Sequence, residues 1–348
     1  YLSKKYTDDP TSFDKSSVNL SGDSMVAELP STKKYKDKVS VIKGKLAWNG
    51  ETENNTEYKW FSEVTDGATK KSESVRNEWK EKIAEEVEGV PIPKGFKHKE
   101  GTKDTGLVIQ DEKGNEFVWV PATESTYVKD TSFPRAIPTG DDTLPNGITD
   151  ETADVVKYGG FYIGRYEAGV PDNQTTIDGK SSSTSNVKGM PVSKKGATVW
   201  RNINYTNAKA NVENMISNEY VQTGLLTGKA WDTTCHWIED SLKSINASAK
   251  LTDSRYYGNH SNSLAPANVS GYGTKQVAGY SDKWMVKNIY DLAGNVWEWT
   301  SEATSSYFIF RGGSYINVGS DYPVSYRGCN DASYTEVSVG FRPRLYIK

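Results

Sequence analysis

The chain has 348 residues, and its 42 Lys and Arg residues nearly balance its 45 Asp and Glu residues, which gives a formal net charge of −3. This balance argues against nucleic acid as the main partner, because nucleic-acid-binding proteins carry a strongly basic surface. The mean hydropathy of −0.68 and the lack of a long apolar run exclude a membrane-spanning helix, so we expect no direct membrane insertion. Residue 1 is not Met, and we interpret the sequence as a mature or trimmed form whose anchor is missing.

The aromatic content is high for a polar chain. Trp occurs 10 times and Tyr 21 times, although only 35% of the residues are hydrophobic. This composition predicts a loop-rich fold whose core is filled by large aromatic side chains. Cys235 and Cys329 are the only cysteines, which excludes a disulfide-dense scaffold and leaves open whether the two pair.

Residues 1–90 form the first expected unit, which is small, polar and rich in Lys. Alternating apolar residues around a Lys-Gly pair predict a hairpin over 38–50, and apolar residues spaced four apart predict a helix over 72–88. Two prolines predict a stiff linker over 90–96. The unit resembles the soluble end of a type IV pilin-like protein, which implies a tether to a cell surface.

Residues 91–348 form the second and larger expected unit, in which short strands alternate with turns. The pattern predicts strands within 105–121 and 159–169, loops over 122–157, 172–186 and 246–279, and helices over 206–220 and 229–242. Thr206 is the expected cap of the first helix. The spacing of Trp231, Cys235 and Ile238 places Cys235 on the core side of the second helix.

Five motifs occur in a fixed order along this unit: GGFYIGRYEAG (159–169), GLLTGKAWDTTCHWI (224–238), NIYDLAGNVWEWTSE (288–302), RGGSY (311–315) and VGFRPRL (339–345). In wording and order they resemble the formylglycine-generating enzyme (sulfatase-modifying factor) family, over about residues 105–348. The resemblance implies an α+β protein with the formylglycine-generating-enzyme variant of the C-type lectin fold.

The residues of these motifs also have a physical interpretation of their own. Gly294 and Asn295 permit a tight turn, after which Trp297 and Trp299 lie on one face of an extended segment and can fill a small core. Arg311 and Arg342 can each donate several hydrogen bonds to carboxylates or carbonyl oxygens. We expect both arginines to act as structural clamps, with ligand contact as the alternative.

The resemblance implies oxidase chemistry by two cysteines that follow the Gly-Gly-Ser-Tyr turn and hold copper. In this chain those positions fall near Asn317 and Tyr322, and neither is a cysteine. We therefore predict that the protein is not an enzyme, with an oxidase of the formylglycine-generating type as the alternative. The three histidines, His98, His236 and His260, are scattered and follow no metal-binding or catalytic pattern.

The stretch 303–335 contains no Lys, Glu, Gln, Met or Trp, although all five types occur elsewhere in the chain. The residue types that fill it include Tyr, Ser, Asn, Asp, Gly, Ile, Val, Cys and Phe. Codons of the form adenine-adenine-pyrimidine give these residues when their adenines are replaced at random, because the pyrimidine third base excludes all five missing types. A turn-rich, Lys-poor loop region is the alternative explanation.

Adenine-directed replacement is the hallmark of diversity-generating retroelements, whose variable proteins also have a C-type lectin fold and a Gly-Phe-Arg type strand at the end. The C-terminal part of this chain resembles such a variable protein, which implies a gut bacterium or its phage as the source. Antibody loops use the same Tyr, Ser and Asn vocabulary for contact. The candidate ligand-binding residues are Tyr307, Tyr315, Asn317, Ser320, Asp321, Tyr322, Ser325, Tyr326, Asn330, Asp331, Ser333 and Tyr334.

No cofactor is required for such a role. The family resemblance allows a calcium ion at the Gly-Asn-Val-Trp-Glu-Trp turn, because calcium prefers hard oxygen ligands. The candidate ligands are Asp291, Asn295, Val296 and Glu298. In the alternative, Asn295 only makes the turn and Glu298 pairs with an arginine.

The sequence therefore predicts a small unit over 1–90 that carries a C-type lectin-like ligand-binding domain over 91–348, with its variable surface at 303–335. The expected function is binding or adhesion, without catalysis, to a protein or glycan ligand on another cell or a phage host. We expect the protein at a cell surface, secreted or on a phage particle. A structural pilus or surface subunit is a further alternative.

Overall fold

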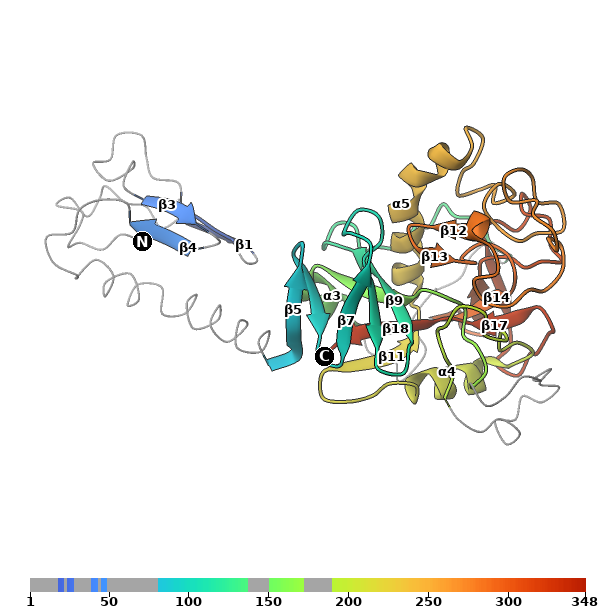
Figure 1. The fold of residues 1–348 in the computed structure, drawn as a ribbon, viewed down its shortest axis with the longest axis horizontal. Coiled ribbons are helices and arrows are strands. Elements are labelled where there is room, and N and C mark those ends of the chain that lie inside the picture. Colours follow the sequence, from blue (N-terminus) through green and yellow to red (C-terminus); the bar gives the residue numbers. More distant parts are fainter. Residues whose placement is uncertain are drawn as a thin grey trace, which may run out of the picture. The chain divides into compact units, whose positions relative to one another are not determined.

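The computed structural model describes residues 81–136, 150–171 and 190–348, together with four short strands near the N-terminus (Figure 1). The chain divides into two compact units, Tyr1–Glu81 and Lys82–Lys348. Two antiparallel hairpins belong to the first unit, β1 (Val18–Ser21) with β2 (Ser24–Ala27) and β3 (Val39–Ile42) with β4 (Lys45–Trp48). The second of them confirms the hairpin predicted over 38–50.

The second unit begins with a further hairpin, β5 (Ile83–Val87) with β6 (Val90–Pro93). The division between the units therefore lies before the expected boundary at residue 90. The helix predicted over 72–88 is wrong from residue 83 onward, because β5 starts there. Residues 72–80 lie outside the described part of the chain. The linker predicted over 90–96 is likewise a strand for most of its length.

Turn geometry and burial explain why the hairpin replaces a helix. Glu88 and Gly89 both adopt positive φ, of 53° and 80°, which gives the twist that favours a two-residue hairpin turn. Val90 and Ile92 are fully buried. Burial of these β-branched side chains outweighs the helix propensity of the preceding Glu-rich stretch.

A six-stranded antiparallel sheet forms one side of the second unit. Its strand order is β11-β18-β10-β9-β8-β7, with bounds β7 (Phe96–Glu100), β8 (Val108–Asp111), β9 (Glu116–Pro121), β10 (Gly160–Gly164), β11 (Val221–Leu225) and β18 (Pro343–Ile347). The pair β8–β9 confirms the hairpin predicted within 105–121, and β10 confirms the strand predicted within 159–169.

In the described part of the second unit the helices are α3 (Thr152–Tyr158), α4 (Tyr205–Glu213), α5 (Gly228–Ile245) and the short 3₁₀ helix η5 (Asp282–Trp284). α3 occupies the end of a stretch predicted to be a loop over 122–157. α4 is shorter than the helix predicted over 206–220, and Asn204 caps it in place of Thr206 by accepting a hydrogen bond from the Asn207 N–H. No helix among the described residues is both long and apolar enough to cross a membrane.

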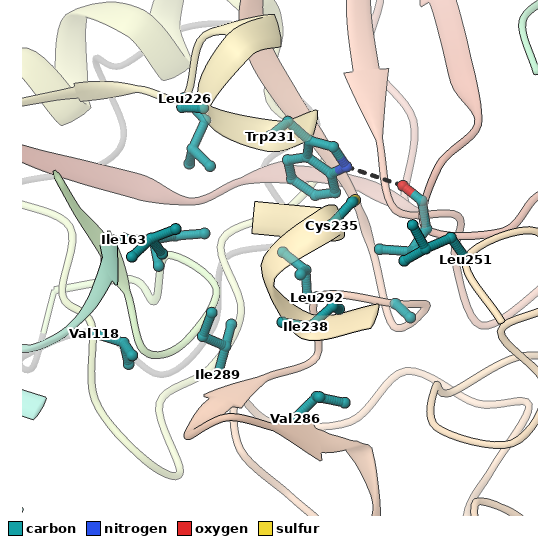
Figure 2. Packing of buried hydrophobic residues seen from close by; sticks show 14 of the residues in the cluster. Val118, Ile163, Leu226, Trp231, Cys235, Ile238, Leu251, Val286, Ile289 and Leu292 are labelled. Carbon is teal, nitrogen blue, oxygen red and sulfur yellow. Dashed lines mark hydrogen bonds between the residues drawn. The ribbon is translucent and has the colours of Figure 1, made fainter. Parts of the chain in front are cut away.

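α5 confirms the helix predicted over 229–242 and packs between the six-stranded sheet and a smaller sheet (Figure 1). Trp231, Cys235 and Ile238 are fully buried along one face of α5, opposite Val118 and Ile163 of the large sheet (Figure 2). The predicted core position of Cys235 is therefore correct. The predicted loop over 246–279 is confirmed, whereas the loop predicted over 172–186 lies outside the described residues.

Candidate ligand-binding surface

The stretch 303–335, called the display segment below, is built on the smaller sheet. This sheet has the strand order β16-β15-β14-β17, with bounds β14 (Trp297–Ala303), β15 (Phe308–Arg311), β16 (Arg327–Asn330) and β17 (Val339–Phe341). A two-stranded sheet of β12 (Met285–Val286) and β13 (Ile289–Tyr290) precedes it. The central loop, residues 312–326, connects β15 to β16 and is the longest loop of the display segment.

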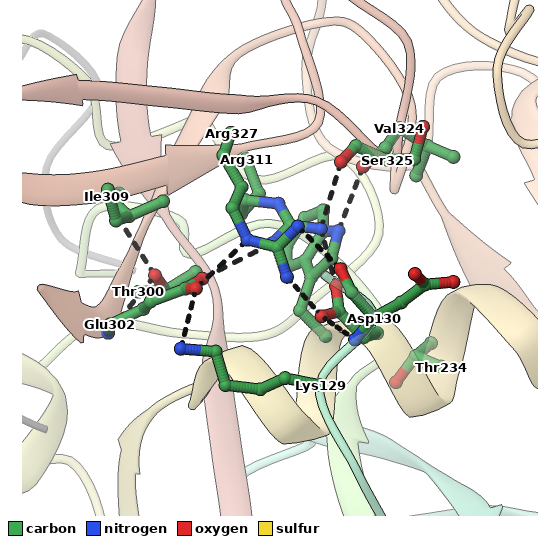
Figure 3. Close-up of polar contacts among 12 residues, drawn as sticks. Lys129, Asp130, Thr234, Thr300, Glu302, Ile309, Arg311, Val324, Ser325 and Arg327 are labelled. Atoms are coloured by element: carbon green, nitrogen blue, oxygen red, sulfur yellow. Dashed lines mark hydrogen bonds and ion pairs between the residues drawn. The ribbon is translucent and has the colours of Figure 1, made fainter. Parts of the chain in front are cut away.

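A buried network of charges holds β14, β15 and β16 against α5. Asp232 of α5 and Glu302 of β14 face Arg311 and Arg327, and each of the four is at most 2% exposed. Arg311 lies 2.6 Å from Asp232 and 3.3 Å from Glu302, while Arg327 lies 3.0 Å from Glu302 and also contacts Asp232. Lys129 reaches Glu302 at 3.2 Å (Figure 3).

The charges in this network compensate one another. Burial disfavours ionisation of Glu302. The attraction of its carboxylate to the positive charges of Arg311, Arg327 and Lys129 outweighs this effect, so the pKa of Glu302 is lowered. For Asp232 burial dominates over the two arginines, so its pKa is raised. Because a buried ion pair is strongly destabilised when one partner is lost, the network ties the three strands to α5. The predicted role of Arg311 as a structural clamp is confirmed.

The central loop is anchored through its backbone atoms. The carbonyl of Asn317 accepts hydrogen bonds from the N–H and the hydroxyl of Ser261, both at 3.0 Å. The N–H of Gly319 donates a hydrogen bond to the side chain of Asn262 at 2.9 Å. The carbonyl of Gly319 accepts a hydrogen bond from the N–H of Ser254 at 3.0 Å. Since these bonds use main-chain atoms of the loop, they do not depend on the side chains that the loop carries.

Two glycines set the start of the central loop. Gly312 and Gly313 have φ of 97° and 73°, in the left-handed region that other residues rarely adopt. A Cβ atom on Gly313 would lie 2.3 Å from the carbonyl oxygen of Tyr322. The Gly-Gly pair therefore permits a close approach of two backbone segments.

With one exception, the candidate binding residues lie at the surface. The exposed ones are Tyr307, Ser320, Asp321, Tyr322, Asp331 and Ser333, and the half-buried ones are Tyr315, Asn317, Tyr326, Asn330 and Tyr334. Ser325 is fully buried, so its assignment to the surface is wrong. Its hydroxyl donates to the carbonyl of Leu251 at 2.9 Å, and its own carbonyl accepts a bond from Arg311 at 3.1 Å.

Aromatic side chains form a connected patch on the display segment. The aromatic patch consists of Trp297, Phe310, Tyr322, Tyr326 and Tyr334. The rings of Tyr322 and Tyr326 lie 5.1 Å apart, and each lies within 6.1 Å of Trp297. Phe310 contacts Trp297 at 5.1 Å and Tyr334 at 6.3 Å. Such ring pairs stabilise one another beyond simple burial, so the tyrosines are presented in fixed positions above a buried base.

Sequence reasoning missed Ile316, which is 53% exposed in the central loop. The signal was available, because Ile is one of the residue types that fill 303–335. A single exposed apolar side chain is ordinary, so Ile316 gains significance only if further exposed apolar residues lie beside it.

A model of the sulfatase-modifying factor enzyme 1-like domain matches residues 106–344. The chain belongs to this family. Family membership confirms the predicted α+β fold, the formylglycine-generating-enzyme variant of the C-type lectin fold. Two similar solved structures are Treponema denticola variable protein 1 and CarF.

The first of these structures is 14% identical, with a TM-score of 0.34, and the match covers 66% of this chain and 95% of that chain. CarF is 18% identical, with a TM-score of 0.34, and the match covers 54% of this chain and 87% of that chain. No curated protein matches this chain.

Two of the four calcium ligands predicted for this domain of the sulfatase-modifying factor family, Asn295 and Glu298, have side-chain oxygens that accept hydrogen bonds from protein groups. Both carboxylate oxygens of Glu298 accept hydrogen bonds from Arg342, at 2.7 to 3.0 Å, which confirms Arg342 as a clamp. The Asn295 side chain accepts a hydrogen bond from the Gln276 N–H at 3.0 Å. Val296 could hold calcium only through its carbonyl; its N–H donates to Glu167 at 3.0 Å.

One carboxylate oxygen of the remaining predicted ligand, Asp291, accepts a bond from the Gly279 N–H at 2.7 Å, and the other has no partner among the described residues. Burial raises the pKa of Asp291 to about 7. Within the described ranges no group of three or more His, Cys, Asp or Glu is placed to hold a metal ion. The calcium site stays a prediction.

The two cysteines lie on different elements of this sulfatase-modifying factor domain, and both are free. Cys235 is fully buried in α5, and Cys329 is half-buried on β16. Burial raises the pKa of both thiols, which disfavours the thiolate that binds metal or attacks a substrate. Asn317 and Tyr322, which stand near the positions of the family's cysteines, belong to the central loop.

Proposed function

We propose that this chain is a non-catalytic ligand-binding protein of the kind that diversity-generating retroelements vary, and that the display segment is its binding surface. The observation that carries the proposal is a separation of roles within the central loop. Main-chain atoms, glycines and buried arginines fix the loop, while eleven of the twelve candidate binding residues of the display segment lie at the surface. A binding surface that must accept many side chains needs this separation.

The chemistry of the surface supports contact with a ligand. Tyr supplies a large amphipathic face at low entropy cost, while Ser and Asn supply adaptable hydrogen bonds. Tyr307 and Tyr322 are 42% and 37% exposed, more than an aromatic side chain with only a packing role. The proposed ligand is a protein or glycan on another cell or a phage host, and the proposed location is a cell surface, the medium or a phage particle.

A binding screen tests this function. Wild-type protein and the triple variant Tyr307→Ser/Tyr322→Ser/Tyr326→Ser are applied to arrays of bacterial surface proteins and glycans. The matched control is Val128→Ser/Val156→Ser, because these side chains are 48% and 37% exposed outside the display segment. We expect a ligand that the wild type and the control retain and the triple variant loses. Equal binding by all three proteins would overturn the proposal.

Two further observations separate the alternatives. Copper loading with oxygen consumption on a cysteine-containing peptide would establish an oxidase. In the genome, we expect a near-copy of the 3′ end of the gene that differs only at adenines, beside a reverse transcriptase. If no such copy lies beside the gene, the proposal that the display segment is diversified is wrong. The binding function is then tested by the screen alone.

A further inference from the structure

Two large apolar side chains are exposed beside the display segment but outside it. Leu264 is 37% exposed and Tyr272 is 41% exposed. Both belong to residues 258–274, called the flanking loop below. Exposed apolar side chains that gather in one region mark contact surfaces, whereas isolated ones are ordinary. The question is whether these two lie next to the display segment.

Contacts between the two loops answer it. Ser261 and Asn262 of the flanking loop bond to the backbone of the central loop, as described above. A Cβ atom on Gly273, which follows Tyr272, would lie 3.5 Å from the Cα of Ser261. The N–H of Leu264 donates to the carbonyl of Arg255, whose side chain lies against Gly319 of the central loop. The backbone of both apolar residues is therefore linked, through Ser261 and Arg255, to residues that contact the central loop.

The exposed charges of this combined region have one sign. Asp321 and Asp331 are exposed in the display segment, whereas its two arginines, Arg311 and Arg327, are buried in the network under the sheet. The flanking loop contains no Asp, Glu, Lys or Arg. Two cations adjoin this region. Lys275 directly follows the flanking loop, and Arg255 is held by the carboxylate of Asp253, at 2.9 and 2.7 Å, with Asp321 also close enough to act on its charge.

We propose that the binding surface of this chain extends onto Leu264 and Tyr272, and that the combined surface takes a protein partner that presents Arg and Lys side chains among apolar ones. This proposal rests on the proposed function. Exposed tyrosine rings attract cations, and the two aspartates add complementary charge. Leu264, Tyr272 and Ile316 supply the apolar contact that typifies the centre of a protein interface. Because Leu264 and Tyr272 lie outside the display segment, their contribution persists when that segment changes.

Short synthetic peptides test the chemistry of the partner. Three labelled peptides of equal length alternate Leu with Arg, with Glu or with Ser, and fluorescence anisotropy measures their binding to the full chain. We expect the Arg–Leu peptide to bind about tenfold more tightly than the Glu–Leu peptide at low salt, and the difference to shrink as salt screens the exposed charges. Equal binding of both peptides, or no binding of the Arg–Leu peptide, would overturn the proposal.

Variants then locate the site. Tyr272→Ser and Leu264→Ser should each weaken the Arg–Leu peptide about threefold to fivefold, while Val156→Ser should leave it unchanged. The charge test compares Asp321→Asn/Asp331→Asn with Glu112→Gln/Glu124→Gln, because both pairs remove two exposed negative charges. Only the first pair should weaken binding, which separates a local effect from the net charge of the chain.

The outcomes also separate this proposal from the one on which it rests. If Tyr322→Ser abolishes binding and both Tyr272→Ser and Leu264→Ser leave it unchanged, the display segment binds alone and the extension is wrong. If Tyr322→Ser, Tyr272→Ser and Leu264→Ser all bind the peptide as the wild type and Val156→Ser do, neither the display segment nor its extension is the binding site. Both proposals then fail.

Discussion

The buried histidine under the central loop makes the strongest quantitative prediction. His260 is fully buried, and no hydrogen bond of normal geometry reaches either ring nitrogen from the described residues. Its ring packs so closely against the central loop that a Cβ atom on Gly319 would lie 2.7 Å from it. Burial lowers the pKa of His260 from 6.5 to about 4, and the Ser314 backbone and the Asp253 charge oppose this only in part.

This pKa shift makes the stability of the domain depend on pH. Below pH 6.5 the unfolded chain binds a proton at residue 260 that the folded chain does not bind until about pH 4. The stability that His260 supplies is therefore complete above pH 6.5 and is lost as the pH falls towards 4. Each pH unit in this window costs about 1.4 kcal/mol, so the loss between pH 6.5 and pH 5 is about 2 kcal/mol.

Another buried group acts in the opposite direction over nearly the same window. The pKa of Asp291 rises from 3.8 to about 7 because the carboxylate is buried. The folded chain therefore binds this proton first, and its stabilising effect grows as the pH falls from 7 towards 3.8. A single stability curve mixes the two effects, so the prediction concerns the difference between the wild type and His260→Gln.

The assay is urea unfolding followed by tryptophan fluorescence, at several pH values between 7 and 5. We expect the unfolding free energy of the wild type to fall, relative to that of His260→Gln, by about 2 kcal/mol across this range. His98→Gln is the control, because the His98 ring is exposed and forms a hydrogen bond with the nearby Gly101 carbonyl. A wild-type-minus-variant difference that stays constant with pH would refute the reasoning.

Other predictions follow from the framework of the display segment. Arg327→Met leaves two buried carboxylates short of a cation and should lower the unfolding free energy by about 3 to 5 kcal/mol, measured in urea. Gly313→Ala must place its Cβ against a backbone carbonyl at positive φ, and should cost roughly 1 to 3 kcal/mol, measured as a lower Tm. In the native protein a water-soluble disulfide reagent should label Cys329 and leave Cys235 unreacted until the chain unfolds.

Local sequence patterns predicted the elements whose structure depends on local interactions. The apolar spacing of Trp231, Cys235 and Ile238 fixed the buried face of α5, and Thr227 caps its start by accepting a bond from the Ala230 N–H. The hairpin β8–β9 follows from two apolar runs on either side of a Lys-Gly-Asn turn. In both cases neighbours within one element carry most of the information.

The errors arise where distant residues decide. The stretch before Gly89 has helical spacing, but the burial of Val90 and Ile92 selects a strand pair. α4 ends at Glu213, because the next residues turn back to β11 and the hydroxyl of Thr223 bonds to the carbonyl of Ile216 at 3.1 Å. A helical pattern that runs past this point cannot reveal a tertiary contact of this kind.

Much the same holds for the binding surface. The Tyr, Ser and Asn vocabulary located the display segment, but it could not distinguish Ser325 from its exposed neighbours. The burial of Ser325 depends on the carbonyl of Leu251, which is remote in the chain. Leu264 and Tyr272 carried no signal, because their exposure matters only once the flanking loop is known to lie beside the central loop.

The buried ion pairs explain how one framework can carry exchangeable side chains. Arg311 and Arg327 lie inside the display segment, but their partners Asp232 and Glu302 lie outside it. Replacing such a network by apolar residues often costs little stability, so stability alone does not account for four buried charges. Their geometry does: each arginine matches its carboxylates only when β15 and β16 keep the observed pairing. These buried residues thus set the register of the two strands and, with it, the position of the central loop. Replacement of side chains at the surface does not change them.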